Sequence, residues 1–252
     1  MKGAIIGDII GSPFEFKQVL DESFVINSDL SDITDDSILT IATASAILEN
    51  HFDYASAYRA FYNSNKNYRY GPGFMRWAEH PKSPNGDSFG NGSAMRVSPI
   101  GWAFDSLEEV MLHAKNSAVP THGHAEGIKG AQAVASAIFL ARKGSSKSEI
   151  QNHIESEFGY DLNDSSFIYS DYFICQTTVP KAINAFLRSD NFEDAIRKAI
   201  VLGIDTDTLA AIAGSIAEAF YQSIPPQLEK LLDQKLSTEL NLFVNQFYQT
   251  YP

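Results

Sequence analysis

The chain has too little cysteine and too little positive charge for several classes of protein. Cys175 is the only cysteine among 252 residues, so no disulfide can form within the chain, and a reducing compartment such as the cytoplasm is expected. The 31 acidic residues outnumber the 19 basic ones, which gives a net charge of −12. Nucleic acids and anionic membranes bind basic surfaces, so neither is expected as a partner.

Long hydrophobic runs and repeats are also missing. No segment reaches the roughly 18 consecutive apolar residues of a membrane span. The apolar start of the chain, GAIIGDII, is interrupted by Asp8 and is typical of neither a signal peptide nor a membrane helix. There is no tandem repeat, low-complexity tract or clear linker, so we expect one domain that covers residues 1–252.

The apolar residues that are present recur mostly at helical intervals. Segment 35–50 is apolar nearly all round, as in a buried helix, and segment 126–144 has the small residues of a close-packed one. Further helices are expected at 178–189, 191–203, 206–223 and 225–251. GAIIGDII cannot be assigned by periodicity, and 165–174 fits either a short strand or a loop. The pattern predicts a compact all-α fold.

Two of these helices begin with clustered aspartates. SDITDDS (31–37) contains Asp32, Asp35 and Asp36, and DTDT (205–208) alternates aspartate with threonine. Either cluster alone is explained by helix capping, because Asp and Thr accept hydrogen bonds from the first amides and favour the positive end of the helix dipole.

Capping needs only one side-chain oxygen per helix, whereas these two clusters offer several. Carboxylate and hydroxyl oxygens suit Mg²⁺, Mn²⁺ or Ca²⁺ rather than zinc. If both helix starts face one cleft, their charges repel each other unless cations lie between them. The residues alone leave capping and metal binding as alternatives.

A polar stretch rich in Gly, Pro and Asn, residues 63–93, is expected to be a long loop, and long loops in compact domains are often functional. Its end, SFGNG, could cradle a phosphate with backbone amides, and Phe89 could stack on a base, although most such segments are simple turns. His122 and His124 precede a helix and are either structural or ligand-facing. Tyr68, Arg69, Tyr70 and Trp77 either pack or shape a site.

Taken in order, GDIIGSPFEF, TDDS, GNGSAMR, EGIKGAQAV, TVPKAI and DTDTLAAIAGSIAEA resemble the ADP-ribosylglycohydrolase family over about residues 3–226. The resemblance implies an all-α fold with a cleft that holds two Mg²⁺ or Mn²⁺ ions. It also implies hydrolysis of the bond between ADP-ribose and an acceptor, which makes ADP-ribosylated proteins or small ADP-ribose conjugates the expected partners.

The family's functional residues are carried over by motif. The metal ligands implied are Thr34, Asp35, Asp36, Asp205, Asp207 and Thr208. The ligand-binding residues implied are Ser88, Phe89, Gly90, Asn91 and His122. Glu15 matches an acidic residue near the metals, and Ile204 stands where the family usually has glycine.

Cleavage at an anomeric carbon needs a carboxylate that manages protons near that carbon or its water. Glu15 is the first candidate for this role and Asp36 the second. The relatives act on arginine-linked, serine-linked or O-acetyl-linked ADP-ribose, and some relatives are structural or only bind. The sequence retains the metal carboxylates, which favours an enzyme, and it leaves the acceptor open.

Overall fold

The structure is a computed structural model that describes residues 1–17, 19–163 and 172–252. The described residues form helices and no strand, which confirms the all-α prediction. The helices are α1 (Lys2–Gly11), α2 (Asp35–Leu48), α3 (Tyr54–Ser64), α4 (Pro72–Glu79), α5 (Gly92–Met95), α6 (Ser98–Ala103), α7 (Leu107–Ala118), α8 (Ala125–Arg142), α9 (Lys147–Phe158), α10 (Cys175–Leu187), α11 (Phe192–Val201), α12 (Thr206–Tyr221), α13 (Pro226–Lys235) and α14 (Thr238–Thr250), with a short 3₁₀ turn η1 (Ser12–Phe14). None of the described helices is both long and apolar enough to cross a membrane.

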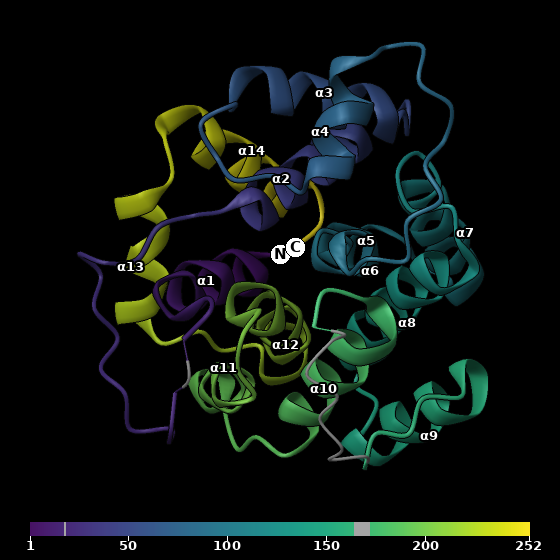
Figure 1. Ribbon diagram of the computed structural model, residues 1–252. Coiled ribbons are helices and arrows are strands. Elements are labelled where there is room, and N and C mark those ends of the chain that lie inside the picture. The colour runs from purple at the N-terminus through teal and green to yellow at the C-terminus, as the bar shows by residue number, and fades with distance from the viewer. Residues whose placement is uncertain (18, 164–171) are drawn as a thin grey trace.

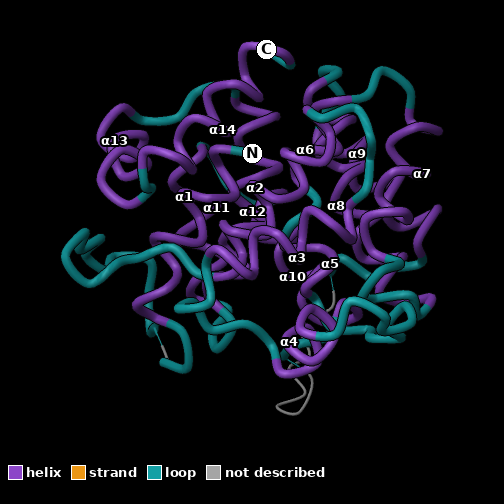
Figure 2. Tube along the Cα trace, turned by 90° about the horizontal axis from the view of Figure 1, so that it is seen from above, coloured by secondary structure: helices purple, strands orange, loops and turns teal. Residues whose placement is uncertain are grey.

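Helices α1, α2, α8 and α12 form the centre of the fold, and the other helices surround them (Figure 1). Nearly every residue of α2 and α12 is buried, because both helices carry small or apolar side chains on all faces. Figure 2 shows that most loops lie on the side of the molecule that carries α4 and α5. The first turns of α2 and α12 contribute to the cavity described below.

The segment GAIIGDII, which periodicity could not assign, is helix α1, packed closely on α12. Glycines at positions 3, 7 and 11 allow this approach. A Cβ added at Gly7 would lie 2.1 Å from the Ala210 carbonyl oxygen, and one at Gly11 would lie 2.4 Å from the Thr206 oxygen. Backbone therefore meets backbone along this face, so the glycines set the distance between the two helices.

The polar stretch 63–93 is not irregular throughout. The prediction of one continuous loop over 63–93 is wrong, because α4 forms inside it with Pro72 at its first position. Phe74 and Trp77 lie on the buried face of that helix. The alternative of strand or loop at 165–174 falls mostly outside the described residues. The single-domain interpretation stays a prediction.

The backbone beside α12 is strained. Ile204 has a φ of +64°, in the left-handed region that disfavours β-branched residues. Its carbonyl oxygen accepts a hydrogen bond from the Phe16 amide (2.9 Å), and Phe16 also has a positive φ of 60°. The turn that precedes Asp205 is thus tied to the segment that carries Glu15.

This strain leads to a stability prediction. Both Ile204→Gly and Ile204→Ala remove the side chain beyond Cβ, but only alanine keeps a Cβ in the left-handed conformation. The glycine variant should therefore be more stable than the alanine variant by about 1 kcal/mol. Urea denaturation of the two variants measures the difference, and equal stabilities would mean that the turn relaxes at no cost.

Candidate metal centre and ligand cavity

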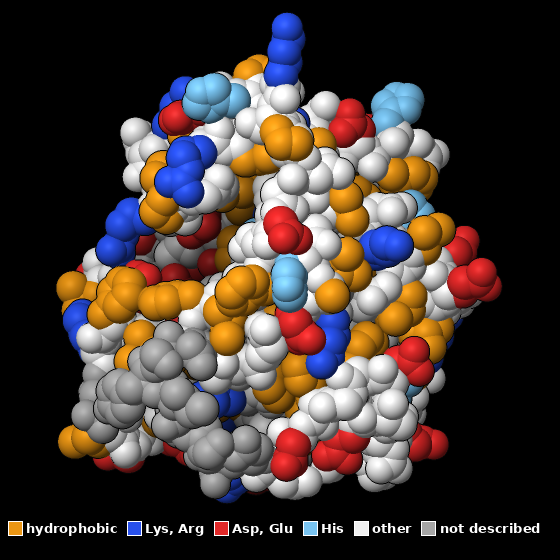
Figure 3. Space-filling model, turned by 45° about the vertical axis from the view of Figure 1, so that its right-hand side comes forward, with side chains coloured by type: hydrophobic (Ala, Val, Ile, Leu, Met, Phe, Trp, Pro, Cys, Tyr) orange, Lys and Arg blue, Asp and Glu red, His pale blue; other side chains and the backbone are white. Residues whose placement is uncertain are grey.

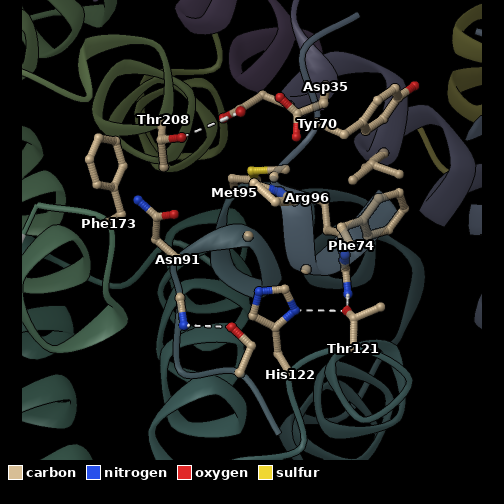
Figure 4. Close-up of a pocket in the computed structure, with 18 of the residues that line it drawn as sticks. Asp35, Tyr70, Phe74, Asn91, Met95, Arg96, Thr121, His122, Phe173 and Thr208 are labelled. Atoms are coloured by element: carbon tan, nitrogen blue, oxygen red, sulfur yellow. Dashed lines mark hydrogen bonds between the residues drawn. The ribbon is translucent and has the colours of Figure 1, made fainter. Parts of the chain in front are cut away.

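A cavity of about 650 Å³ opens beside the starts of α2 and α12. The hollow with acidic side chains at its bottom is visible in Figure 3. One wall carries carboxylates, a second carries the glycine-rich loop 86–92 with His122, and a third carries Tyr70, Phe74 and Trp77. The predicted acidic, glycine-rich and aromatic segments therefore surround one space (Figure 4).

At the start of α2, one threonine both caps the helix and joins the acidic cluster. Thr34 Oγ1 accepts a hydrogen bond from the Asp36 amide (3.2 Å) and lies 3.5 Å from Asp36 Oδ2. The same hydroxyl donates to Asp8 Oδ1 (2.8 Å), and Asp8 Oδ2 accepts from the Thr34 amide (2.9 Å). Asp8 of α1 thus holds the first turn of α2 in place.

The start of α12 faces this turn. Thr208 Oγ1 donates to Asp36 Oδ2 at 3.3 Å, so the two predicted halves of the site are in direct contact. Glu15, Asp205 and Asp207 each offer a carboxylate oxygen, and these three atoms lie within 4.8 Å of one another. Asp35 lines the same cavity and is close enough to Asp207 for the two charges to repel each other. The structure therefore brings together Thr34, Asp35, Asp36, Asp205, Asp207, Thr208 and Glu15.

Capping does not account for Asp205, although Asp207 Oδ1 accepts a hydrogen bond from the Thr208 amide in the first turn of α12 (2.9 Å). Asp205 is the N-cap residue of α12, yet its side chain accepts no capping hydrogen bond. Its Oδ2 instead accepts a hydrogen bond from Asn91 Nδ2, which connects the glycine-rich loop to the carboxylates. Asp205 therefore serves the cavity rather than the helix terminus.

Burial and mutual repulsion make the carboxylates costly to ionise. The pKa values of Asp35, Asp36 and Asp205 are raised well above the usual range, first by burial and then by the charge of Asp207. Burial and Asp207 likewise raise the pKa of Asp8 to about 7, against its hydrogen bonds from Ser37 and Thr34. A group of buried carboxylates this close is stabilised by cations.

One buried oxygen supports the fit to a cation directly. Asp36 Oδ1 is buried and has no hydrogen-bond partner in the described part of the chain, although its other oxygen meets both threonines. A buried carboxylate oxygen without a donor is unfavourable unless something positive meets it. Together with the hydroxyls, these carboxylates form an all-oxygen donor set that suits Mg²⁺ or Mn²⁺.

The predicted ligand loop lies mostly on the cavity wall. Ser88, Gly90, Asn91 and His122 all line the cavity. Ser88 Oγ accepts a hydrogen bond from the backbone amide of Gly90 (3.1 Å), and the backbone amide of Asn91 donates one to the Phe173 carbonyl (2.9 Å). Phe89 is not among the described residues that line the cavity. Its side chain is half exposed, and its ring centre lies 5.2 Å from that of His124.

Helix α4 and the residues just before it contribute several side chains to the cavity wall. Tyr70 and Trp77 are buried, whereas Arg69 is largely exposed and forms an ion pair with Glu15 (3.2 Å). The carboxyl pKa of Glu15 is raised by partial burial and by Asp207, and Arg69 opposes that rise. Glu15 therefore lies at the edge of the carboxylate cluster, next to a positive side chain.

Sequence analysis missed three residues that support the site. Asp8 lies in the motif GDIIGSPFEF, in which the sequence assigned no role to this position. A carboxylate inside an apolar run nevertheless indicates a buried polar contact. Arg96 and Thr121 also lie on the cavity wall. Arg96 ends the motif GNGSAMR and Thr121 directly precedes His122, but nothing in the local pattern indicates that these two side chains meet.

Comparison with known proteins gives a consistent result. The family model described as ADP-ribosylglycohydrolase matches residues 1–251. Human ADP-ribosylhydrolase ARH3 is 26% identical, with 88% of this chain and 84% of that protein covered. ADP-ribosylarginine hydrolase Tri1 of Pseudomonas putida is 26% identical, with coverages of 94% and 76%. A solved structure titled ADP-ribosylglycohydrolase-related protein complex superposes with a TM-score of 0.77, at 20% identity and with coverages of 100% and 97%.

Proposed function

We propose that this chain, which belongs to the ADP-ribosylglycohydrolase family, hydrolyses the glycosidic bond between ADP-ribose and an acceptor. We further propose that this reaction needs two Mg²⁺ or Mn²⁺ ions. The observation that carries the proposal is the contact between the two acidic helix starts, where Thr208 donates to Asp36 at the cavity wall. Retention of Asp35, Asp36, Asp205 and Asp207 favours an enzyme over a binding or structural relative.

The cavity residues divide the work by their chemistry. Asp35, Asp36, Asp205 and Asp207, with Thr34 and Thr208, would hold the ions. Cations bound there would orient the ribose hydroxyls and lower the pKa of a water. The Ser88–Asn91 loop is the proposed diphosphate site, since successive backbone N–H groups bind such groups well. The Gly90 and Asn91 amides now donate to Ser88 Oγ and to the Phe173 carbonyl, and they would have to exchange these partners for the diphosphate.

Glu15 is the proposed proton-transfer group, with Asp36 as the second candidate. Glu15 lies on the cavity wall beside Asp205 and Asp207, and its raised pKa favours proton exchange nearer to neutral pH than for an ordinary glutamate. Asp36 is buried, its Oδ2 accepts a hydrogen bond from Thr208, and its Oδ1 has no partner among the described residues, so it is better suited to holding a cation.

The acceptor is tested by offering arginine-linked, serine-linked and O-acetyl-linked ADP-ribose in parallel, with Mg²⁺ or with EDTA, and measuring free ADP-ribose. We expect release from at least one conjugate with Mg²⁺ and loss of that release with EDTA. The linkage that is cleaved decides between a mono-ADP-ribosylated protein and a small conjugate as substrate. A thermal shift with ADP-ribose but no release from any conjugate would contradict the proposed enzymatic activity and favour a binding module.

The cytoplasmic location stays a prediction.

A further inference from the structure

A buried arginine lies behind the glycine-rich loop and has few partners. Arg96 follows α5 and is fully buried, with its guanidinium carbon 4.0 Å from the centre of the Tyr58 ring. Its Nη2 donates to the Ser117 carbonyl (3.1 Å) and to Thr121 Oγ1 (2.7 Å). Within the described residues, Nε and Nη1 have no hydrogen-bond partner. Because a guanidinium does not lose its proton, Arg96 can only donate to Thr121.

The Thr121 hydroxyl that accepts from Arg96 also contacts His122. Its Oγ1 lies 2.7 Å from His122 Nδ1, and both side chains are buried at the cavity wall (Figure 4). The hydroxyl has one hydrogen, and His122 is the only other side-chain partner that the described residues provide for it. Arg96 uses one of the two lone pairs of this hydroxyl. If the other lone pair accepted from Nδ1–H, the hydroxyl hydrogen would have no side-chain acceptor among the described residues, so the hydroxyl is satisfied when it donates to Nδ1.

The other ring nitrogen then carries the proton and faces the ligand loop. A Cβ added at Gly92 would lie 3.0 Å from His122 Nε2, and one added at Gly90 would lie 3.6 Å from it. The absence of side chains at these two positions therefore leaves Nε2 next to the loop backbone and the cavity.

We propose that Arg96 and Thr121 are positioning residues that hold His122 in the neutral form with its proton on Nε2. The cavity then presents an N–H donor at this point, suited to a ribose hydroxyl or a phosphate oxygen of the substrate. The choice of ADP-ribose as the probe rests on the proposed function, whereas the tautomer of His122 does not.

The electrostatic surroundings agree with a neutral ring. Burial, and then the charge of Arg96, lower the pKa of His122 to about 3, so the imidazole is uncharged near neutral pH. A neutral histidine has two tautomers, and the hydrogen bond made by one nitrogen selects which of them is present.

The direct test is a ¹⁵N–¹H correlation spectrum of the ligand-free protein labelled at histidine, which distinguishes the two tautomers. The wild type should show His122 protonated at Nε2. Thr121→Val keeps the shape but removes the donor, so a mixture of tautomers is expected. Its ADP-ribose dissociation constant should rise by about tenfold, the effect of one buried hydrogen bond. Thr121→Ser keeps the hydroxyl, so it should keep the wild-type spectrum and bind within about twofold of wild type.

Two results would overturn the proposal. One is a wild-type His122 protonated at Nδ1, which can be observed even if no variant folds. The other is an unchanged tautomer in Thr121→Val, because weaker binding would then come from general disruption. A wild type that shows the Nε2 tautomer but does not bind ADP-ribose would count against the proposed function and leave the positioning role intact.

Discussion

Replacing Asp36 with asparagine is expected to reduce divalent-metal affinity and ADP-ribose release by at least about a hundredfold, more than the loss of a residue that only supports a ligand. Asp36 is the side chain that both helix starts share, since Oδ2 meets Thr34 and Thr208 while Oδ1 has no partner among the described residues. Calorimetric titration with Mn²⁺ and an ADP-ribose release assay measure the two effects.

The same substitution should not weaken the fold. The raised pKa of Asp36 means that folding disfavours its ionised form, so at neutral pH without metal the charge destabilises the protein. Asp36→Asn should therefore unfold at the same temperature as the metal-free wild type or higher.

Asp32→Asn is the matched control for Asp36→Asn. Asp32 belongs to the same acidic stretch but is exposed, and its carboxylate accepts a hydrogen bond from the Ile33 amide. It should retain wild-type metal binding and turnover. Equal losses in Asp32→Asn and Asp36→Asn would mean that general negative charge, rather than a defined site, attracts the metal.

Gly7→Ala is expected to give the largest loss of stability. The new Cβ would lie 2.1 Å from the Ala210 carbonyl oxygen and 2.4 Å from its carbonyl carbon, which a side-chain rotation cannot relieve. Helices α1 and α12 must separate, and this overpacking should lower the free energy of unfolding by about 3 kcal/mol. Thermal unfolding should show a midpoint lowered by roughly 6–12 °C for a chain of this size.

Gly73→Ala provides the contrast. Gly73 lies in the first turn of α4, where an added Cβ meets nothing within 4 Å. Alanine favours the helix, so the variant should match or exceed wild-type stability. A comparable loss in both variants would mean that glycine flexibility, and not the approach of α1 to α12, explains the effect.

Much of the fold could be predicted because the central helices carry strong patterns. The small and apolar residues of α2, α8 and α12 are typical of buried helices, and these helices lie where expected within a few residues. Helix α1 could not be assigned, because its glycines serve packing on a distant segment rather than local periodicity. Helices α7 and α9 begin with Ser106 and Ser146, each followed three residues later by glutamate, and this capping signal was available but unused.

The acidic part of the site was readable from sequence because metal ligands occur in short clusters at helix starts. That the two clusters meet across the cavity depends on the packing of α1, α2 and α12, which no local pattern gives. Arg96 and Thr121 illustrate the limit more clearly. They are separated by 24 intervening residues, and only folding brings Arg96 to Thr121 and its neighbour His122.

The most direct test of the metal centre is anomalous diffraction from crystals of the protein soaked in Mn²⁺. The arrangement of Asp36 between the starts of α2 and α12 predicts two manganese peaks in the cavity, each within ligand distance of carboxylates from both helix starts. Crystals saturated with Mn²⁺ that show no peak there, or peaks only at surface carboxylates such as Asp32, would contradict it.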